Sequence, residues 1–517
     1  MNRGRDSNTI GSSVAEKRTD PMPYRPNVLL IVIDQFRADL LDGALAKAAG
    51  LKHLAALVEV SCQFRQHYTV VTPCGPSRVS LFTSQYARNH RAVRNGTPLR
   101  NDTPNLARAM RAAGYDPMLF GYTDVAQDPR VLPADDPRLQ SYEELLPGFT
   151  EVVRQRLESD DTAWRDHLRA RGYTVPDGMA LYVPDGDTLD APARYRAEDS
   201  DTAFLTDRFL AHMGGARAPW FATLTYIRPH PPLVAPAPYN RLVNPASVPP
   251  PQQPDDKRVH PFVDALRKTS PAHRTVEGFG AFDATPDAIN TLRAVYLGLA
   301  AEVDHHIGRV VDWLKASGHW DDTVLVVTAD HGEMLGDHGL WGKSSFHDAA
   351  FHVPLLMRVP WLAPRRVEAM TESIDVAPTL LDLVGRASPD AFNGESLGAL
   401  LEGGEGGKAV TVSEHDFGNP ISPSRVQHAL DVTADQANFA VLRTATHRLV
   451  HFAAPLPQVV YDMSDRGERQ DIAQRPGNEA LRLDLTSQLL SHGMTHPEST
   501  FASTLVTNAG VQRAGGG

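Results

Sequence analysis

The feature that most constrains the fold is the alternation of short, uninterrupted aliphatic runs with longer helical patterns. The runs occupy residues 28–33, 118–122, 221–227 and 324–328. Runs of this kind are typical of parallel strands that are buried on both faces and joined by crossover helices. Between residues 290 and 317, apolar side chains recur every three or four positions, a pattern that predicts one long helix ending at Gly318. The sequence therefore predicts an α/β fold.

The pattern changes after the glycine pairs near residue 405. The chain continues in short β-branched and aromatic segments at residues 409–413, 439–443, 448–452 and 459–462. These segments predict a smaller antiparallel sheet, followed by a helix near residues 478–490. We expect a disordered segment over 1–25, a catalytic domain over 26–400, a C-terminal α+β subdomain over 401–500 and a tail over 501–517.

Composition limits the partners that this chain is expected to have. Its 517 residues include 51 Lys and Arg against 62 Asp and Glu, a formal net charge of −11. An acidic balance disfavours binding to nucleic acid or to an anionic membrane. Each aliphatic run is far shorter than the ~20 residues of a membrane span. The first 26 residues contain no apolar segment typical of a secretory signal, so we expect a cytoplasmic protein without membrane or nucleic-acid partners.

The chain has two cysteines, too few for a framework of disulfides. Cys62 lies in a semi-apolar stretch and is expected to be a small buried side chain. Cys74 stands just before an expected helix start, where free N–H groups and the helix dipole favour an anion or a polarised nucleophile. Arg78, one turn later, supplies a fixed positive charge.

Polar side chains follow two of the aliphatic runs. Asp34 and Gln35 come after the first run, and Asp330 and His331 come after the run at 324. Ligands of open parallel sheets collect at the carboxyl ends of the strands. Carboxylates, an amide oxygen and an imidazole form a mixed donor set for a divalent cation. Each Asp alone is better explained by helix capping, but the two together favour a metal site.

The residues 74–78, Cys-Gly-Pro-Ser-Arg, resemble the signature of the sulfatase family within the alkaline phosphatase superfamily, in which this cysteine is oxidised to formylglycine. The stretch from Asp330 to Lys343 resembles the second metal and lysine motif of the family. Residues 34–39 and 227–232 resemble phosphonate monoester hydrolases and their arylsulfatase relatives. The resemblance implies an alkaline phosphatase-like fold, with a large, mixed, mostly parallel sheet flanked by helices.

The resemblance also implies roles for individual residues. The implied metal ligands are Asp34, Gln35, Asp330, His331 and the modified Cys74; the implied catalytic residues are Cys74, Arg78, His230 and Lys343; and the implied substrate contacts are Asn95, Tyr122 and Thr123. The implied cofactors are one divalent ion, Ca²⁺ or Mn²⁺, and the formylglycine that a formylglycine-generating enzyme makes from Cys74. The implied reaction cleaves sulfate monoesters, phosphonate monoesters or phosphodiesters through a covalent intermediate on modified Cys74, in a homo-oligomer. Asp124 stands where the family has a hydroxyl residue, and a carboxylate there would repel an anionic substrate.

Two other functions remain open at this point. A phosphodiesterase or phosphatase of the same superfamily would use two metals, with Asp124 and His230 as the spare ligands. A non-catalytic, metal-stabilised binding protein is opposed by the presence of Cys74, Arg78 and Lys343, which a structural metal site does not require. Three further histidines are interpreted as structural, namely His338, His347 and His352.

Overall fold

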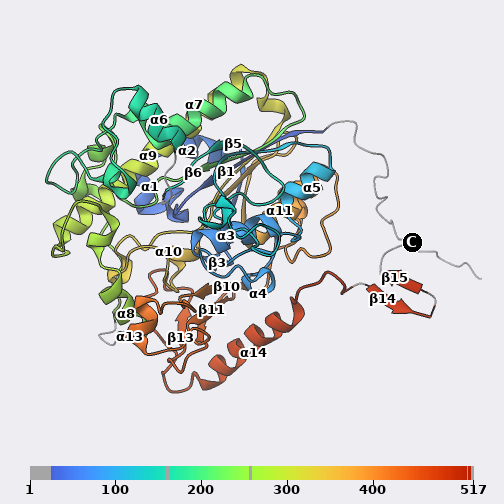
Figure 1. Ribbon diagram of the computed structural model, residues 1–517. Helices are drawn as coiled ribbons and strands as arrows, with labels where there is room; N and C mark the ends of the chain where they lie inside the picture. The colour runs from blue at the N-terminus through green and yellow to red at the C-terminus, as the bar shows by residue number, and fades with distance from the viewer. Residues whose placement is uncertain (1–24, 158–161, 256–258, 503, 509, 514–517) are drawn as a thin grey trace, which may run out of the picture.

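The computed structural model describes residues 25–157, 162–255, 259–502, 504–508 and 510–513. Most of the segment expected to be disordered, and the four C-terminal residues, lie outside these ranges. Within them, an α/β body occupies the upper part of Figure 1 and a second, smaller sheet lies below it.

The body is built on an eight-stranded sheet with the order β5-β4-β6-β1-β7-β8-β2-β9. Its strands are β1 (Asn27–Ile33), β2 (Cys62–Tyr68), β4 (Pro117–Gly121), β5 (Thr150–Arg154), β6 (Phe221–Tyr226), β7 (Thr323–Ala329), β8 (Leu355–Arg358) and β9 (Arg365–Glu372). β8 runs antiparallel to β7 and β2, whereas the other neighbouring strands are parallel. This mixed, mostly parallel sheet confirms the expected fold class.

Burial on both faces explains why the first strand is continuously aliphatic. Leu29, Ile31 and Ile33 pack into the hydrophobic core on one face of the sheet, and Val28 and Leu30 pack into the core on the other. Because successive side chains of a strand point to opposite faces, both sets must be apolar.

Helices cover both of these cores, and further helices pack against the second sheet. The helices are α1 (Gly43–Ala49), α2 (Lys52–Glu59), α3 (Cys74–Thr83), α4 (Ala87–His90), α5 (Leu106–Ala112), α6 (Thr162–Ala170), α7 (Asp201–Met213), α8 (Pro261–Thr269), α9 (Pro286–Ala316), α10 (Asp348–Phe351), α11 (Val376–Leu383), α12 (Gly398–Glu402), α13 (Arg425–Leu430) and α14 (Glu479–Thr495). The long α9 confirms the helix expected at 290–317. Thr285 caps its N-terminus by accepting a hydrogen bond from the Ala288 N–H on its side chain, and Pro286 is the first residue of the helix.

The second sheet has the order β13-β12-β11-β10-β3. Its strands are β3 (Val71–Thr72), β10 (Thr411–Asp416), β11 (Asn438–Arg443), β12 (His447–Phe452) and β13 (Val459–Asp462). Strands β10 to β13 are antiparallel, as expected from the short β-branched and aromatic segments there. The short β3 was not expected from the sequence. It pairs in parallel with β10 and leads directly into Cys74, so the second sheet supports the start of α3.

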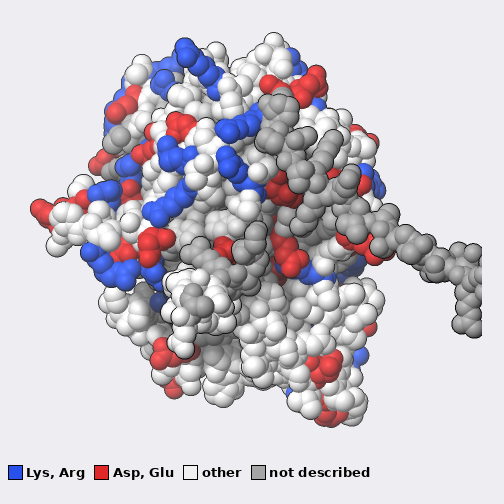
Figure 2. Space-filling view, turned by 90° about the vertical axis from the view of Figure 1, so that its right-hand side faces the viewer, with Lys and Arg blue, Asp and Glu red and all other residues white. Residues whose placement is uncertain are grey.

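The segment expected to be a tail contains a hairpin of β14 (Thr504–Thr507) and β15 (Gly510–Arg513), which projects to the right of the body in Figure 1. On the face shown in Figure 2, Lys and Arg gather over the upper part, whereas the lower part is mostly uncharged. In the described part of the chain, every helix is too short or too polar to cross a bilayer. Both cysteines are buried and free, as expected for Cys62; burial was not expected for Cys74.

Candidate active site

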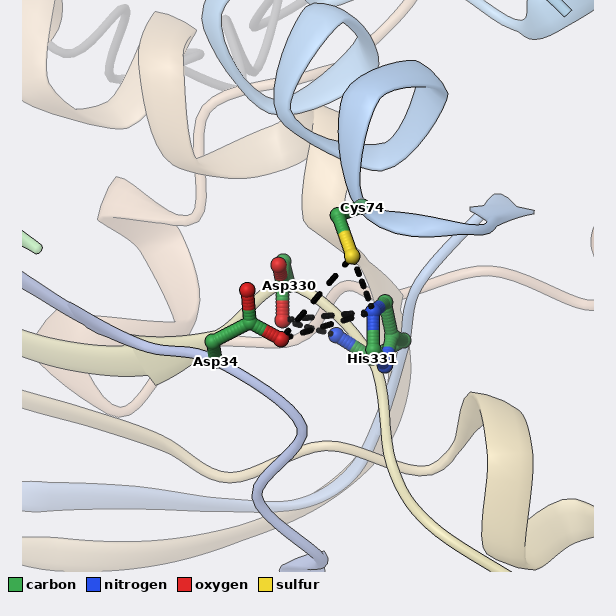
Figure 3. Close-up of side chains that lie close together, drawn as sticks. All are labelled: Asp34, Cys74, Asp330 and His331. Carbon is green, nitrogen blue, oxygen red and sulfur yellow. Dashed lines mark hydrogen bonds and ion pairs between the residues drawn. The ribbon is translucent and has the colours of Figure 1, made fainter. Parts of the chain in front are cut away.

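Two strand ends and one helix start meet at a single point. β1 and β7 are parallel neighbours in which Ile33 pairs with Ala329, so Asp34 and Asp330 leave the same edge of the sheet. Cys74 opens α3 above this edge (Figure 3). Asp34, Cys74, Asp330 and His331 are all buried, and one candidate ligand atom from each lies within 4.8 Å of the others. The structure therefore brings together four of the five residues expected to bind a metal.

The imidazole of His331 presents a lone pair to this cluster. Its Nδ1 lies 3.0 Å from the Gly332 carbonyl oxygen, which only a protonated nitrogen suits, so Nε2 carries no hydrogen in the neutral ring. Burial, followed by the charge of Lys343, lowers the pKa of His331 to about 3. Nε2 lies 3.7 Å from Asp34 Oδ1 and 3.8 Å from Asp330 Oδ1. A lone pair facing two carboxylate oxygens is unfavourable without a cation between them, so this donor set fits a divalent ion.

Cys74 is only 4% exposed, and its Sγ lies 3.2 Å from His331 Nε2 and 3.9 Å from Asp34 Oδ1. Burial and the neighbouring Asp34 raise the pKa of the thiol well above its ordinary value. The thiolate is the nucleophilic form of cysteine, so an unmodified Cys74 is a weak nucleophile here in the absence of the ion.

Arg78 is completely buried one turn into α3. It donates from Nε to Asp330 Oδ2 at 3.0 Å, and from Nη2 to Asp34 Oδ2 at 3.2 Å and to the Tyr122 hydroxyl at 2.9 Å. The Tyr122 hydroxyl also donates to Asp34 Oδ2, and its ring lies under the guanidinium at 4.1 Å. Arg78 and Tyr122 thus fix the carboxylates of Asp34 and Asp330, a role that differs from the solvated surface position most common for arginine.

Lys343 joins His230 and Gln35 beside the cluster. Lys343 Nζ lies 2.6 Å from His230 Nε2 and donates to Gln35 Oε1 at 2.8 Å. His230 Nδ1 lies 2.6 Å from the Pro231 carbonyl oxygen, so Nδ1 carries the ring hydrogen and Nε2 accepts from the ammonium.

The charge of this pair resides on the lysine. Burial and then Lys343 lower the pKa of His230 to about 3. Burial lowers the pKa of Lys343, but the charges of Cys74, Asp34 and Asp330 raise it by more. The pKa of Lys343 is therefore above its ordinary value. Lys343 is therefore the proton carrier at neutral pH, and His230 is neutral.

The expected substrate contacts differ in where their polar groups point. Asn95 Oδ1 accepts from the Gly75 N–H at 3.0 Å and so touches the start of α3. Thr123 Oγ1 donates to the Glu144 carbonyl oxygen at 2.9 Å and accepts from the Leu146 N–H at 2.8 Å. Its hydroxyl therefore holds the neighbouring loop, and the expected contact with substrate stays a prediction.

Several residues that support the site were given no role from the sequence. Glu333 accepts from Gln35 Nε2 and, at 2.8 Å, from the Leu335 N–H. Arg228 donates to the carbonyl oxygens of His230 at 2.9 Å and Pro232 at 3.1 Å, while its Nε binds Asp201 at 2.9 Å. Glu333 lies in the stretch from Asp330 to Lys343 and Arg228 lies in residues 227–232, the two motifs that resemble the family. This position was the only sign in the sequence that they belong to the site. Their roles depend on contacts across the chain, which spacing does not reveal.

Comparison with known proteins agrees with this geometry. A family model described as sulfatase matches residues 26–386, and one described as N-sulphoglucosamine sulphohydrolase, C-terminal, matches residues 336–494. The multifunctional alkaline phosphatase superfamily protein PehA of Trinickia caryophylli is 36% identical over 503 residues, covering 92% of this chain and 97% of PehA.

Two solved structures are also similar. The phosphonate monoester hydrolase SpPMH from Silicibacter pomeroyi has a TM-score of 0.92 and 49% identity, covering 95% of this chain and 99% of that one. The phosphonate monoester hydrolase of Agrobacterium radiobacter has a TM-score of 0.88 and 36% identity, covering 95% and 100%. Fold and similarity together define a hydrolase of the alkaline phosphatase superfamily. Within that superfamily, the chain belongs to the sulfatase family.

Proposed function

We propose that this hydrolase cleaves sulfate monoesters, phosphonate monoesters and phosphodiesters, and that it depends on one divalent cation and on formylglycine made from Cys74. The observation that carries the proposal is the convergence of Cys74 with Asp34, Asp330 and His331 on one buried point. Similarity to two phosphonate monoester hydrolases, and to a choline-sulfatase of Rhizobium meliloti at 25% identity, supports this range of substrates.

Asp34, Asp330 and His331 would hold the cation, together with the side chain at position 74 and, as expected from the resemblance, Gln35. A divalent ion bound there supplies electrostatic stabilisation of the oxygens around the reacting sulfur or phosphorus, and Ca²⁺ and Mn²⁺ both accept this donor set. Hydrated formylglycine would supply an oxygen nucleophile in place of a thiol whose pKa is raised by burial.

The chain's own residues bind and protonate the substrate. Arg78 gives its donors to Asp34, Asp330 and Tyr122, so its role here is to orient these groups rather than to bind the ester. Lys343 keeps a donor beyond those it gives to His230 and Gln35, and this N–H is placed to bind the transferred group and to give its proton to the leaving oxygen. His230 accepts from Lys343 and fixes the direction of the ammonium. Arg228 in turn holds the loop of His230.

The two-metal alternative has less support. It requires His230 as a ligand of a second ion, but His230 Nε2 already accepts from the Lys343 ammonium. Of the two spare ligands that a second metal would need, only Asp124 is then left. Metal analysis of the purified protein separates the two proposals, since one ion per chain is expected here and two are expected for the alternative. A homo-oligomeric assembly and a cytoplasmic location stay predictions.

Substitution of Cys74 tests the proposal. Cys74→Ala is expected to abolish hydrolysis of nitrophenyl sulfate, of a nitrophenyl phosphonate monoester and of bis(nitrophenyl) phosphate. Cys62→Ala is the matched control, because Cys62 is also buried but its thiol lies beside the carbonyl oxygens of Ala363 and Leu401 in the hydrophobic core rather than in the cluster of candidate metal ligands. Full turnover by Cys74→Ala would refute the proposal. Peptide mass spectrometry of residues 72–78 gives a second test, since oxidation of the thiol to the aldehyde lowers the mass by about 18 daltons.

A further inference from the structure

Asp124 is a buried carboxyl group in the site that the mechanism above does not use. It follows β4 by three residues and has a φ of 53°, in the left-handed region that Asp and Asn tolerate best among residues with a side chain. It is 7% exposed, and its Oδ1 has no hydrogen-bond partner among the described residues. Buried carboxyl oxygens are normally bonded, so an open one indicates a position where a ligand or solvent arrives.

Asp124 packs against the start of α3. A Cβ added to Gly75 would lie 2.8 Å from the Asp124 carbonyl oxygen and 3.0 Å from Asn95 Oδ1. The residue that follows the proposed nucleophile is therefore in direct contact with the Asp124 backbone. Position 75 has to be glycine for the loop and the helix to approach this closely.

The carboxyl of Asp124 also acts on the site electrostatically. Its charge raises the pKa of the Cys74 thiol and contributes to the upward shifts of Arg78 and Tyr122. The pKa of Asp124 itself is raised, first by burial and then by Asp34, with Arg78 acting in the opposite direction. The group thus lies within electrostatic range of the atoms that surround the transferred group.

Asp124 differs from the other two carboxylates in lacking a cation of its own. Arg78 binds both Asp34 and Asp330 directly, at 3.2 Å and 3.0 Å. Among the described residues, Asp124 Oδ1 accepts from no donor. When ionised, Asp124 therefore has no direct ion pair of the kind that Asp34 and Asp330 form with Arg78, and its charge acts on whatever binds beside Cys74.

We propose that Asp124 is a specificity-determining residue that favours esters with one negative charge on the transferred group over esters with two. This inference rests on the proposed function. Sulfate monoesters, phosphonate monoesters and phosphodiesters carry one charge at neutral pH. Phosphate monoesters carry two above their second pKa of about 6.

The discrimination follows from the second charge. A doubly charged ester is repelled by the carboxylate or forces it to take up a proton, and either event costs binding free energy that a singly charged ester largely avoids. For one unit charge at a separation of ~6 to 10 Å and an effective dielectric constant of about 20, the effect is roughly 15- to 100-fold in kcat/KM.

Asp124→Asn tests the inference, because asparagine keeps the size of the side chain and tolerates the same left-handed backbone. At pH 8, kcat/KM is measured for nitrophenyl phosphate and for bis(nitrophenyl) phosphate with the wild type and the variant. The ratio of the first to the second is expected to rise roughly 15- to 100-fold in the variant. Calorimetric titration measures the dissociation constants of sulfate, which is doubly charged at pH 8, and of dimethyl phosphate; binding of sulfate should strengthen relative to dimethyl phosphate in the variant, and this readout needs no turnover.

Asp102→Asn is the matched control, since it removes the same charge from an exposed carboxylate that pairs with Arg100. It is expected to leave both ratios unchanged. Unchanged ratios in Asp124→Asn, or the same shift in both variants, would overturn the inference. If wild-type protein with verified aldehyde content hydrolyses none of the esters, the proposed function fails instead, and the dissociation constants from the titrations still report on Asp124.

Discussion

Replacement of Lys343 by methionine separates proton donation from simple charge stabilisation. Methionine keeps the length and apolar stem of the side chain but removes the ammonium, which lies 2.6 Å from His230 Nε2 and donates to Gln35 Oε1 at 2.8 Å. Since the pKa of His230 is about 3, the histidine holds no proton that it could supply in place of the lysine near neutral pH.

The expected loss of rate depends on the leaving group. General acids contribute typically 10²- to 10⁴-fold, and the full amount is needed only when the departing oxygen is basic. Phenol, with a pKa near that of tyrosine at about 10, needs the proton far more than nitrophenol does. We therefore expect Lys343→Met to lower kcat for phenyl esters by about 10³-fold and for nitrophenyl esters by about 10-fold or less.

The assay compares the two ester series on one preparation of the variant, so any loss of folded protein cancels. Loss of the lysine leaves the polar atoms of His230 and Gln35 without a donor, which costs about 1 to 3 kcal/mol of stability, and thermal unfolding measures this separately. An equal loss of rate for phenyl and nitrophenyl esters would refute the assignment of Lys343 as the acid.

Other perturbations have expected outcomes that follow from contacts described above or from burial. Arg78→Met leaves two buried carboxylates without their cation and should lower the free energy of unfolding by about 3 to 5 kcal/mol. Urea denaturation of the metal-free protein measures this loss, and a change under about 1 kcal/mol would contradict the ion-pair geometry. Gly332→Ala places a Cβ 2.0 Å from the Ala349 carbonyl oxygen, and about 1 to 3 kcal/mol of destabilisation with weakened metal binding is expected from the same denaturation curves and a metal titration. His90 is fully buried with a pKa of about 3, so between pH 6.5 and 3 the unfolded chain binds the extra proton, and stability should fall by about 1.4 kcal/mol per pH unit on acidification. His90→Gln should reduce the slope of unfolding free energy against pH by that amount, and an unaltered slope would speak against a neutral buried His90. Chelation should abolish ester hydrolysis, and Ca²⁺ or Mn²⁺ should restore it; turnover by protein shown by metal analysis to be ion-free would exclude the metal-dependent mechanism.

The main sheet could be predicted because its strands are buried on both faces. The run at 28–33 corresponds to β1, and the apolar period at 290–317 corresponds to α9 (Pro286–Ala316). Strand β3, by contrast, consists of two residues, Val71 and Thr72, and its pairing with β10 depends on a segment more than 300 positions away. Two residues carry no periodicity, so such a strand cannot be found from the local pattern.

The site was predictable where its chemistry is local and unpredictable where it depends on packing. Asp34 and Asp330 were identified because each follows a buried run, and the parallel pairing of those runs brings them together. Arg78 resembles a surface charge in sequence, yet every residue of α3 is buried and the guanidinium lies between two carboxylates. The neutral state of His230 also escaped sequence reasoning, because it results from burial and from the ammonium of Lys343, which follows it by more than 100 residues.

The pairing of β3 with β10 has a consequence for the biosynthesis of the protein. Cys74 is buried, and the two residues of β3, which precede it by two and three positions, pair with Glu414 and His415 of β10. The ribosome adds this part of β10 some 340 residues after Cys74. In the finished fold an oxidising enzyme would find no thiol within reach. The proposed conversion of this cysteine would therefore have to take place on the nascent or newly released chain, before β10 pairs with β3.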